Sequence, residues 1–203
     1  MSYLVEPYGE ILLILQSLLT GHPRRALKQF MFRWRLAHPD RPTRLHLGCG
    51  QRKLPGFINI DLNDGPAVDY VGNILRLPCP DESVERIESY HVIEHIPLPV
   101  VESVVRSWYR LLIPGGVVVA ECPDINRAMM EYLDGNQDRI YSIYGRQRFS
   151  GDAHFFGYNH DSLIQLFSSV GFANCVCGEG TDYHSKLEPC LRIECRKPTS
   201  NKS

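Results

Sequence analysis

The sequence predicts an α/β fold built on a doubly wound, mostly parallel sheet of seven strands, with a C-terminal antiparallel strand pair and an N-terminal helical cap. Short β-type segments alternate with helical segments from residue 44 onward, which is the pattern of parallel sheets. The first β-type segment ends in a Gly-x-Gly turn, and the second ends in an acid. The 203 residues are enough for one domain with a sizeable core.

The apolar pattern also gives expected limits for each element. Strands are expected at residues 44–47, 57–61, 68–71, 83–90, 117–120, 174–177 and 191–196, of which the last two form the antiparallel pair. Helices are expected at residues 9–19, at 24–37, after Pro97 to about 112, from a cap at Asp124 to about 133, and at 161–170, where Asp161 is the expected cap.

The chain divides into an N-terminal helical extension (1–40), a main domain (41–197) and a disordered tail (198–203). In the extension, Leu27, Phe30, Met31 and Trp34 share one helical face. The first interpretation is a cap that packs on the main domain. The alternative is a basic amphipathic helix that rests on anionic lipid, which gives residues 9–37 a peripheral membrane contact.

Composition narrows the function classes. With 22 basic and 23 acidic residues, no global field attracts nucleic acid. Seven cysteines without a CxxC pair indicate free thiols in a reducing cytoplasm rather than a disulfide framework or a zinc knuckle. No secretory signal pattern and no apolar run of about 20 residues is present, so we expect a soluble, cytoplasmic chain.

The Gly-x-Gly turn indicates a nucleoside-containing cofactor. Gly48 and Gly50 let the backbone approach a ligand closely, and Asp61 can accept hydrogen bonds from both ribose hydroxyls. A dinucleotide site is excluded because Gln51 follows in place of further glycines and because the acid comes too soon after the turn. No Gly-Lys-Ser/Thr phosphate loop is present.

Two further sequence motifs make the indication of a nucleoside-containing cofactor more specific. Residues 77–83 read LPCPDES and residues 91–96 read HVIEHI. They resemble the LPFPDxSFD and SxHVLEHI elements of class I S-adenosylmethionine-dependent methyltransferases, which have a Rossmann-like fold. The LLIPGG run at 111–116 is similar to the LKPGG element of the same group. The resemblance covers residues 44–196.

The resemblance implies that the chain transfers a methyl group from S-adenosyl-L-methionine. It implies contacts of the glycines with the methionine part, of Asp61 with the ribose, of Asn73 and Ile74 with the adenine, and of His91 with the region of the sulfonium. The implied cofactor-binding residues are Gly48, Cys49, Gly50, Asp61, Leu62, Asn73, Ile74 and His91.

The chain departs from the family between its first two strands. The gap from Gly48 to Asp61 leaves no room for the usual crossover helix, so residues 51–56 are expected to form a loop or a single turn. This loss removes a helix N-terminus that would hold the methionine carboxylate. Arg52 or Lys53 is the expected replacement.

The acceptor is not encoded in a motif. An aromatic loop at residues 148–160 is expected to form its pocket, and together with the apolar first helix it favours a small-molecule, lipid-like or glycan-precursor acceptor. If the acceptor must lose a proton, His91 is the first candidate base and His154 the second.

Two rival functions use the same residues. One is a protein that binds S-adenosylmethionine without turnover. The other reads His91, Glu94 and His95 as an H-x-x-E-H zinc hydrolase signature. Because the sequence shows no motif for a third ligand, we expect no metal, with His95 as a hydrogen-bonded helix residue and Glu94 as a structural acid.

Overall fold

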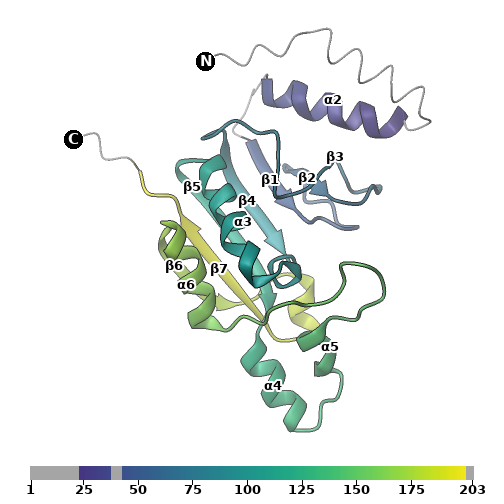
Figure 1. Cartoon of the computed structure of the whole chain (residues 1–203), viewed down its shortest axis with the longest axis vertical. Coiled ribbons are helices and arrows are strands. Elements are labelled where there is room, and N and C mark those ends of the chain that lie inside the picture. The colour runs from purple at the N-terminus through teal and green to yellow at the C-terminus, as the bar shows by residue number, and fades with distance from the viewer. Residues whose placement is uncertain (1–22, 38–42, 200–203) are drawn as a thin grey trace.

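The computed structural model describes residues 23–37 and 43–199 (Figure 1). Its centre is a seven-stranded sheet with the order β3-β2-β1-β4-β5-β7-β6. Neighbouring strands from β3 to β5 are parallel, while β7 runs antiparallel to both β5 and β6. The predicted doubly wound sheet with a C-terminal antiparallel pair is therefore confirmed.

The strands lie close to their expected positions. They are β1 (Thr43–Leu47), β2 (Ile58–Asp61), β3 (Tyr70–Val71), β4 (Val84–Tyr90), β5 (Leu112–Pro123), β6 (Ala173–Glu179) and β7 (Cys190–Arg196). β3 is shorter than predicted and β5 much longer, because the Pro-Gly-Gly run predicted to precede that strand lies inside it. An irregularity in the pairing with β4 accommodates the run.

The helices are α2 (Pro23–Ala37), α3 (Leu98–Leu111), α4 (Ile125–Leu133), α5 (Arg139–Tyr144) and α6 (His160–Val170). Two single 3₁₀ turns, η1 (Ile93–His95) and η2 (Tyr183–Lys186), follow β4 and precede β7. The sequence did not predict α5. The first predicted helix, at 9–19, lies outside the described residues.

Helix ends follow local side-chain chemistry. Asp124 caps α4 as predicted, since its carboxylate accepts hydrogen bonds from the Asn126 and Arg127 backbone amides. α6 is capped by Asn159 rather than Asp161, because Asn159 and Ser162 bond to each other's backbone amides in a capping box.

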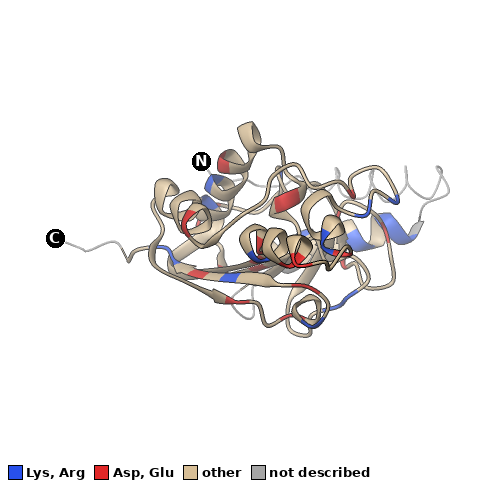
Figure 2. Ribbon diagram, turned by 90° about the horizontal axis from the view of Figure 1, so that it is seen from below, with Lys and Arg blue, Asp and Glu red and all other residues tan. Residues whose placement is uncertain are grey.

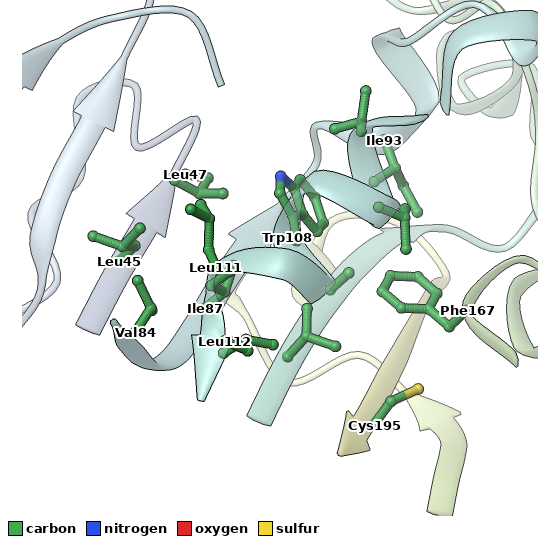
Figure 3. Close-up of a cluster of buried hydrophobic side chains, with 14 of the residues drawn as sticks. Leu45, Leu47, Val84, Ile87, Ile93, Trp108, Leu111, Leu112, Phe167 and Cys195 are labelled. Atoms are coloured by element: carbon green, nitrogen blue, oxygen red, sulfur yellow. The ribbon is translucent and has the colours of Figure 1, made fainter. Parts of the chain in front are cut away.

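The core lies between the sheet and the pair α3 and α6, which contact each other over β5, β6 and β7 (Figure 3). Trp108 on α3 and Phe167 on α6 are fully buried there. On β1, Leu45 and Leu47 are fully buried in the same cluster. This packing fixes the carboxyl ends of β1 and β4 side by side.

α2 packs on the sheet edge at β3 (Figure 1). Its contact face is not the predicted one: Leu27, Met31 and Trp34 are more than half exposed. Phe32 is buried instead, and its ring stacks on Tyr70 with centroids 4.1 Å apart. β3 has two residues, and its single aromatic ring is that of Tyr70. The face of α2 that carries Phe32 packs against this ring.

The structure bears on two expectations drawn from composition. The prediction of free thiols is wrong for Cys175 and Cys195, which form a disulfide between the adjacent strands β6 and β7. No CxxC spacing signals this bond, because sheet pairing brings the two residues together. Among the described residues, no helix has the length and apolarity needed to cross a bilayer.

The core assignment predicts unequal effects of one substitution at two sites. Leu47→Ala in β1 should lower the free energy of unfolding by about 2–5 kcal/mol, because it leaves a cavity in a fully buried site. Leu133→Ala at the exposed end of α4, where the side chain is 83% exposed, should cost less than about 0.5 kcal/mol. Urea unfolding measures both, and equal losses would contradict this placement of the core.

Candidate active site

A cleft of about 760 Å³ opens at the carboxyl ends of β1 and β4. The chain runs outward in opposite directions along the sheet from these two strands, and such switch points are where α/β sheets bind ligands. The volume lies within the range of small-molecule sites. The lining residues are His46, Gly48, Cys49, Gly50, Gln51, Arg52, Lys53, Leu54, Tyr90, His91, His95, Arg148, Phe149, Asp152, Thr181, Asp182, Tyr183 and His184.

The glycine turn forms one wall of the cleft. Gly48 and Gly50 have φ values of +69° and +53°, a region that favours glycine. A Cβ atom on Gly48 would lie 2.2 Å from Cγ2 of Val92, whereas a Cβ on Gly50 would meet nothing within 4 Å. Gly48 is therefore required by the packing of the turn after β4, and Gly50 is the glycine that faces open space.

Asp61 ends β2 beside this turn. Its Oδ2 accepts the Gly50 amide at 2.8 Å, and its Oδ1 accepts the Asn63 amide at 2.9 Å. A carboxylate oxygen can accept two hydrogen bonds. Each oxygen therefore keeps a lone pair for a further donor, which is the capacity that two ribose hydroxyls need.

The connection from β1 to β2 contains no helix, as predicted. Buried Asn59 holds this loop: its Oδ1 accepts the Leu54 amide at 2.7 Å, and its Nδ2 donates to the Leu54 carbonyl and to Asp69. Lys53 pairs with the other oxygen of Asp69. The loop is therefore fixed by side chains of β2 and of the segment before β3.

The segment around η2 covers the opposite side of the cleft. Glu121, buried at the end of β5, accepts hydrogen bonds from the Thr181 amide and hydroxyl and from the Asp182 amide. Arg192 on β7 neutralises the same carboxylate at 2.9 Å. One buried acid thus anchors this covering segment to the sheet.

This covering segment around η2, called the cover below, also contacts the loop that follows β1. Asp182 pairs with Arg52 at 3.3 Å, and the Arg52 guanidinium lies over the Tyr183 ring at 3.8 Å from its centroid. The neighbouring His184 ring is 3.8 Å from the ring of His91. The cover therefore reaches the cleft walls formed after both β1 and β4.

His91 directly follows β4 and has a positive φ of +54°, which is uncommon for a residue with a side chain. Its Nδ1 lies 3.2 Å from Oε1 of Glu94, and its Nε2 lies 3.5 Å from the Cys190 sulfur. Burial lowers the pKa of His91, but the contacts with Cys190 and Glu94 outweigh it and raise the pKa to about 10. The ring is therefore protonated at neutral pH.

Glu94, His95 and His154 meet behind His91. One ligand-type atom from each side chain lies within 4.8 Å of the others. The pKa of His154 is below the ordinary histidine value because the ring is buried. The structure thus brings the two sequence-predicted catalytic histidines, His91 and His154, to either side of one buried carboxylate.

The other predicted contacts divide into two groups. Gly48, Cys49, Gly50 and His91 line the cleft. Asp61, Leu62, Asn73 and Ile74 lie beyond its rim, after β2 and β3, where Leu62 and Asn73 are exposed. The Asn73 side-chain oxygen accepts the Leu75 amide at 2.9 Å, which orients this carbonyl and leaves one lone pair free.

Sequence reasoning missed three residues that shape the site. His46 is buried, lines the cleft and contacts Asn59 at 2.9 Å. Asn59 and Glu121 each stand within an apolar strand. A polar residue at a buried strand position was the signal available, because such a residue needs a specific partner.

The comparisons with known proteins agree with this geometry. Residues 45–120 match the family model of a methyltransferase domain. No curated protein matches the sequence.

Solved structures share the fold at low identity. A methyltransferase from Thermotoga maritima is 16% identical, with a TM-score of 0.54, over 91% of this chain and 98% of that one. A Methanosarcina mazei methyltransferase is 16% identical, with a TM-score of 0.55, over 79% and 95%. The 1,6-didemethyltoxoflavin-N1-methyltransferase of Burkholderia thailandensis, solved with its substrate and S-adenosylhomocysteine, is 12% identical, with a TM-score of 0.55, over 98% and 93%.

At these identities the structural matches show the fold, while the family match covers the glycine turn, the acid after β2 and the segment after β4. Both findings agree with the resemblance seen in the sequence. Residues 45–120 thus match a methyltransferase domain, and the chain has the fold of S-adenosylmethionine-dependent methyltransferases.

Proposed function

We propose that this protein transfers a methyl group from S-adenosyl-L-methionine to a small or amphiphilic acceptor bound in the cleft. The observation that carries the proposal is the arrangement at the switch point. A glycine turn and an acid with free lone pairs stand on one side, and a histidine cluster around a buried carboxylate stands on the other. We call the side with the glycine turn and the acid the cofactor half of the cleft, and the side with the histidine cluster the acceptor half.

The residues present fit the cofactor. Asp61 offers lone pairs to the ribose hydroxyls, and Gly50 leaves space for the methionine part. Asn73 and Ile74 follow β3, where the adenine is proposed to bind. The cofactor supplies an activated methyl group, so the protein mainly has to align the acceptor and exclude water.

The methionine carboxylate is assigned to Arg52. Lys53 and Arg52 both line the cleft, but Lys53 is held by Asp69 at the loop base. Arg52 is fixed by Asp182 and Tyr183 at the cleft rim. Its fork of N–H donors can bind a second carboxylate while it keeps this ion pair.

The acceptor is proposed to be a small molecule, a lipid or a glycan precursor rather than nucleic acid. Phe149 from the predicted aromatic loop and Tyr183 from the cover line the cleft and give it apolar surface. Figure 2 shows basic residues gathered on α2, while acidic and basic residues mix over the rest of the described chain. The basic side chains that line the cleft are each paired with an acid: Arg52 with Asp182, Lys53 with Asp69 and Arg148 with Asp152. They therefore do not form a free basic stripe for a phosphate backbone.

The acceptor is proposed to be activated at the cluster of His91, Glu94, His95 and His154. A zinc hydrolase that uses both His91 and His95 as ligands is disfavoured, because that signature requires a helix with its histidines one turn apart. Here the segment is a single 3₁₀ turn that begins after His91. The histidines therefore do not share a helix face.

Cofactor binding gives the first test. Asp61→Ala should weaken binding of S-adenosylhomocysteine about tenfold to a hundredfold, the range for losing hydrogen bonds to a charged acceptor. Asp64→Ala removes a nearby acid that pairs with Lys28 and should leave affinity unchanged. Calorimetric titration measures both variants. No heat with the wild type, or equal affinities for both folded variants, would refute the cofactor placement.

Methyl transfer gives the second test. The wild type should move labelled methyl from the cofactor into a small-molecule, lipid or glycan fraction of a metabolite extract. With that acceptor, His91→Gln and His154→Gln should keep cofactor affinity but lose about 10²–10⁴-fold in turnover, the scale of proton-transfer catalysis. Exposed His160, replaced by Gln, is the matched control.

The outcomes of this assay separate the alternatives. Full turnover in both variants would exclude the histidine cluster from the reaction. Tight binding of S-adenosylhomocysteine without transfer to any fraction would contradict the enzyme proposal and favour the non-catalytic binding protein.

A further inference from the structure

Glu94 is a buried acid whose carboxylate oxygens keep unused hydrogen-bonding capacity. The residue is 1% exposed, and neither of its carboxylate oxygens has a hydrogen bond of acceptable geometry among the described residues. The His91 ring stands beside one of these oxygens, with its Nδ1 3.2 Å from Oε1. The carboxylate still keeps lone pairs that a further cation can use.

Two imidazoles next to Glu94 are oriented by backbone carbonyls. His95 Nδ1 lies 3.0 Å from the Ala153 carbonyl oxygen, and His154 Nδ1 lies 3.0 Å from the Ser142 carbonyl oxygen. A carbonyl accepts only, so each Nδ1 carries the proton and each Nε2 keeps its lone pair. A histidine that donates one ring N–H to the backbone in this way is typical of metal ligands.

The three side chains are close enough to bind one ion. Their ligand atoms lie within 4.8 Å of one another, while a tetrahedral ion with bonds of about 2.1 Å holds its ligands about 3.4 Å apart. Small side-chain rotations close that difference. The rings of His95 and His154 already stand edge to face at 4.7 Å.

We propose that Glu94, His95 and His154 form a binding site for a divalent transition-metal ion, with Zn²⁺ as the best match to two imidazoles and one carboxylate. Three protein ligands leave at least one coordination position open, as in catalytic sites. His95 also lines the cleft, so the site borders the acceptor half.

No sequence motif marks a third ligand, which is why no metal was expected. His154 comes from the loop before α6, and a bond from the Phe155 amide to the Glu94 carbonyl at 2.8 Å holds this loop against η1. Folding therefore completes a set of which only two members are adjacent in sequence.

The inference deepens the proposed methyltransferase and rests on it for the role of the ion. A metal ion that binds the hydroxyl oxygen of an acceptor lowers the pKa of that hydroxyl. The proton passes to water, the oxygen forms the new C–O bond with the methyl carbon, and the S–C electron pair returns to sulfur as S-adenosylhomocysteine leaves. Nothing is oxidised or reduced. The site thus points to an acceptor that carries a hydroxyl group.

Metal binding is testable without any acceptor. Full-length protein without an affinity tag is stripped with chelator and dialysed against Zn²⁺, and the bound metal and the shift in thermal midpoint are measured. The wild type should bind one Zn²⁺ per chain and gain stability. Glu94→Gln and His154→Gln should bind at least tenfold more weakly and lose the shift, while His160→Gln should behave as the wild type.

Three results would overturn the site: no stoichiometric Zn²⁺ in the wild type, undiminished binding in a folded Glu94→Gln or His154→Gln, or binding of Mg²⁺ in preference to Zn²⁺. If one variant does not fold, the other still decides the question. Titration with S-adenosylhomocysteine separates the two proposals. Cofactor binding without zinc refutes only the metal site, and zinc without cofactor binding refutes only the methyltransferase.

Discussion

The close approach of Gly48 to Val92 is the constraint on which the site depends. With a Cβ atom on Gly48, the two residues would overlap at 2.2 Å, so the turns after β1 and β4 can meet only because that position is glycine. The contact sets the glycine turn beside the segment that carries His91 and Glu94. The proposed cofactor half and acceptor half of the cleft are adjacent because two parallel strands end at the same height.

The covering segment depends on a second buried group, the Glu121 carboxylate. Its bonds to Thr181, Asp182 and Arg192 fix η2 over the cleft, and Asp182 then fixes Arg52. In the proposed function, Arg52, which the cover holds in place, takes the part of the crossover-helix N-terminus that this chain lacks.

The sequence was sufficient for most of the fold because apolar periodicity and glycine positions are local signals. β1, β2, β4, α3 and α4 follow from such signals, as does the loop in place of the first crossover. The lengths of β3 and β5 were misjudged, since pairing with neighbouring strands, rather than local propensity, decides where a strand ends. The disulfide of Cys175 and Cys195 and the contact face of α2 depend on tertiary packing in the same way.

The site was predictable where one segment carries it and not where folding assembles it. Gly48, Gly50 and His91 stand in recognisable blocks and line the cleft. The roles of Glu121 and Asn59 depend on partners far along the chain, as does the meeting of His154 with Glu94 and His95. A single buried polar residue in a strand or turn is a weak signal until its partner is known.

A crystal structure of the full chain with S-adenosylhomocysteine tests the central claim most directly. The account predicts ribose hydroxyls on Asp61, the amino-acid carboxylate near Arg52 and the sulfur directed toward His91. A ligand bound elsewhere, or one whose sulfur points away from the histidine cluster, would contradict it.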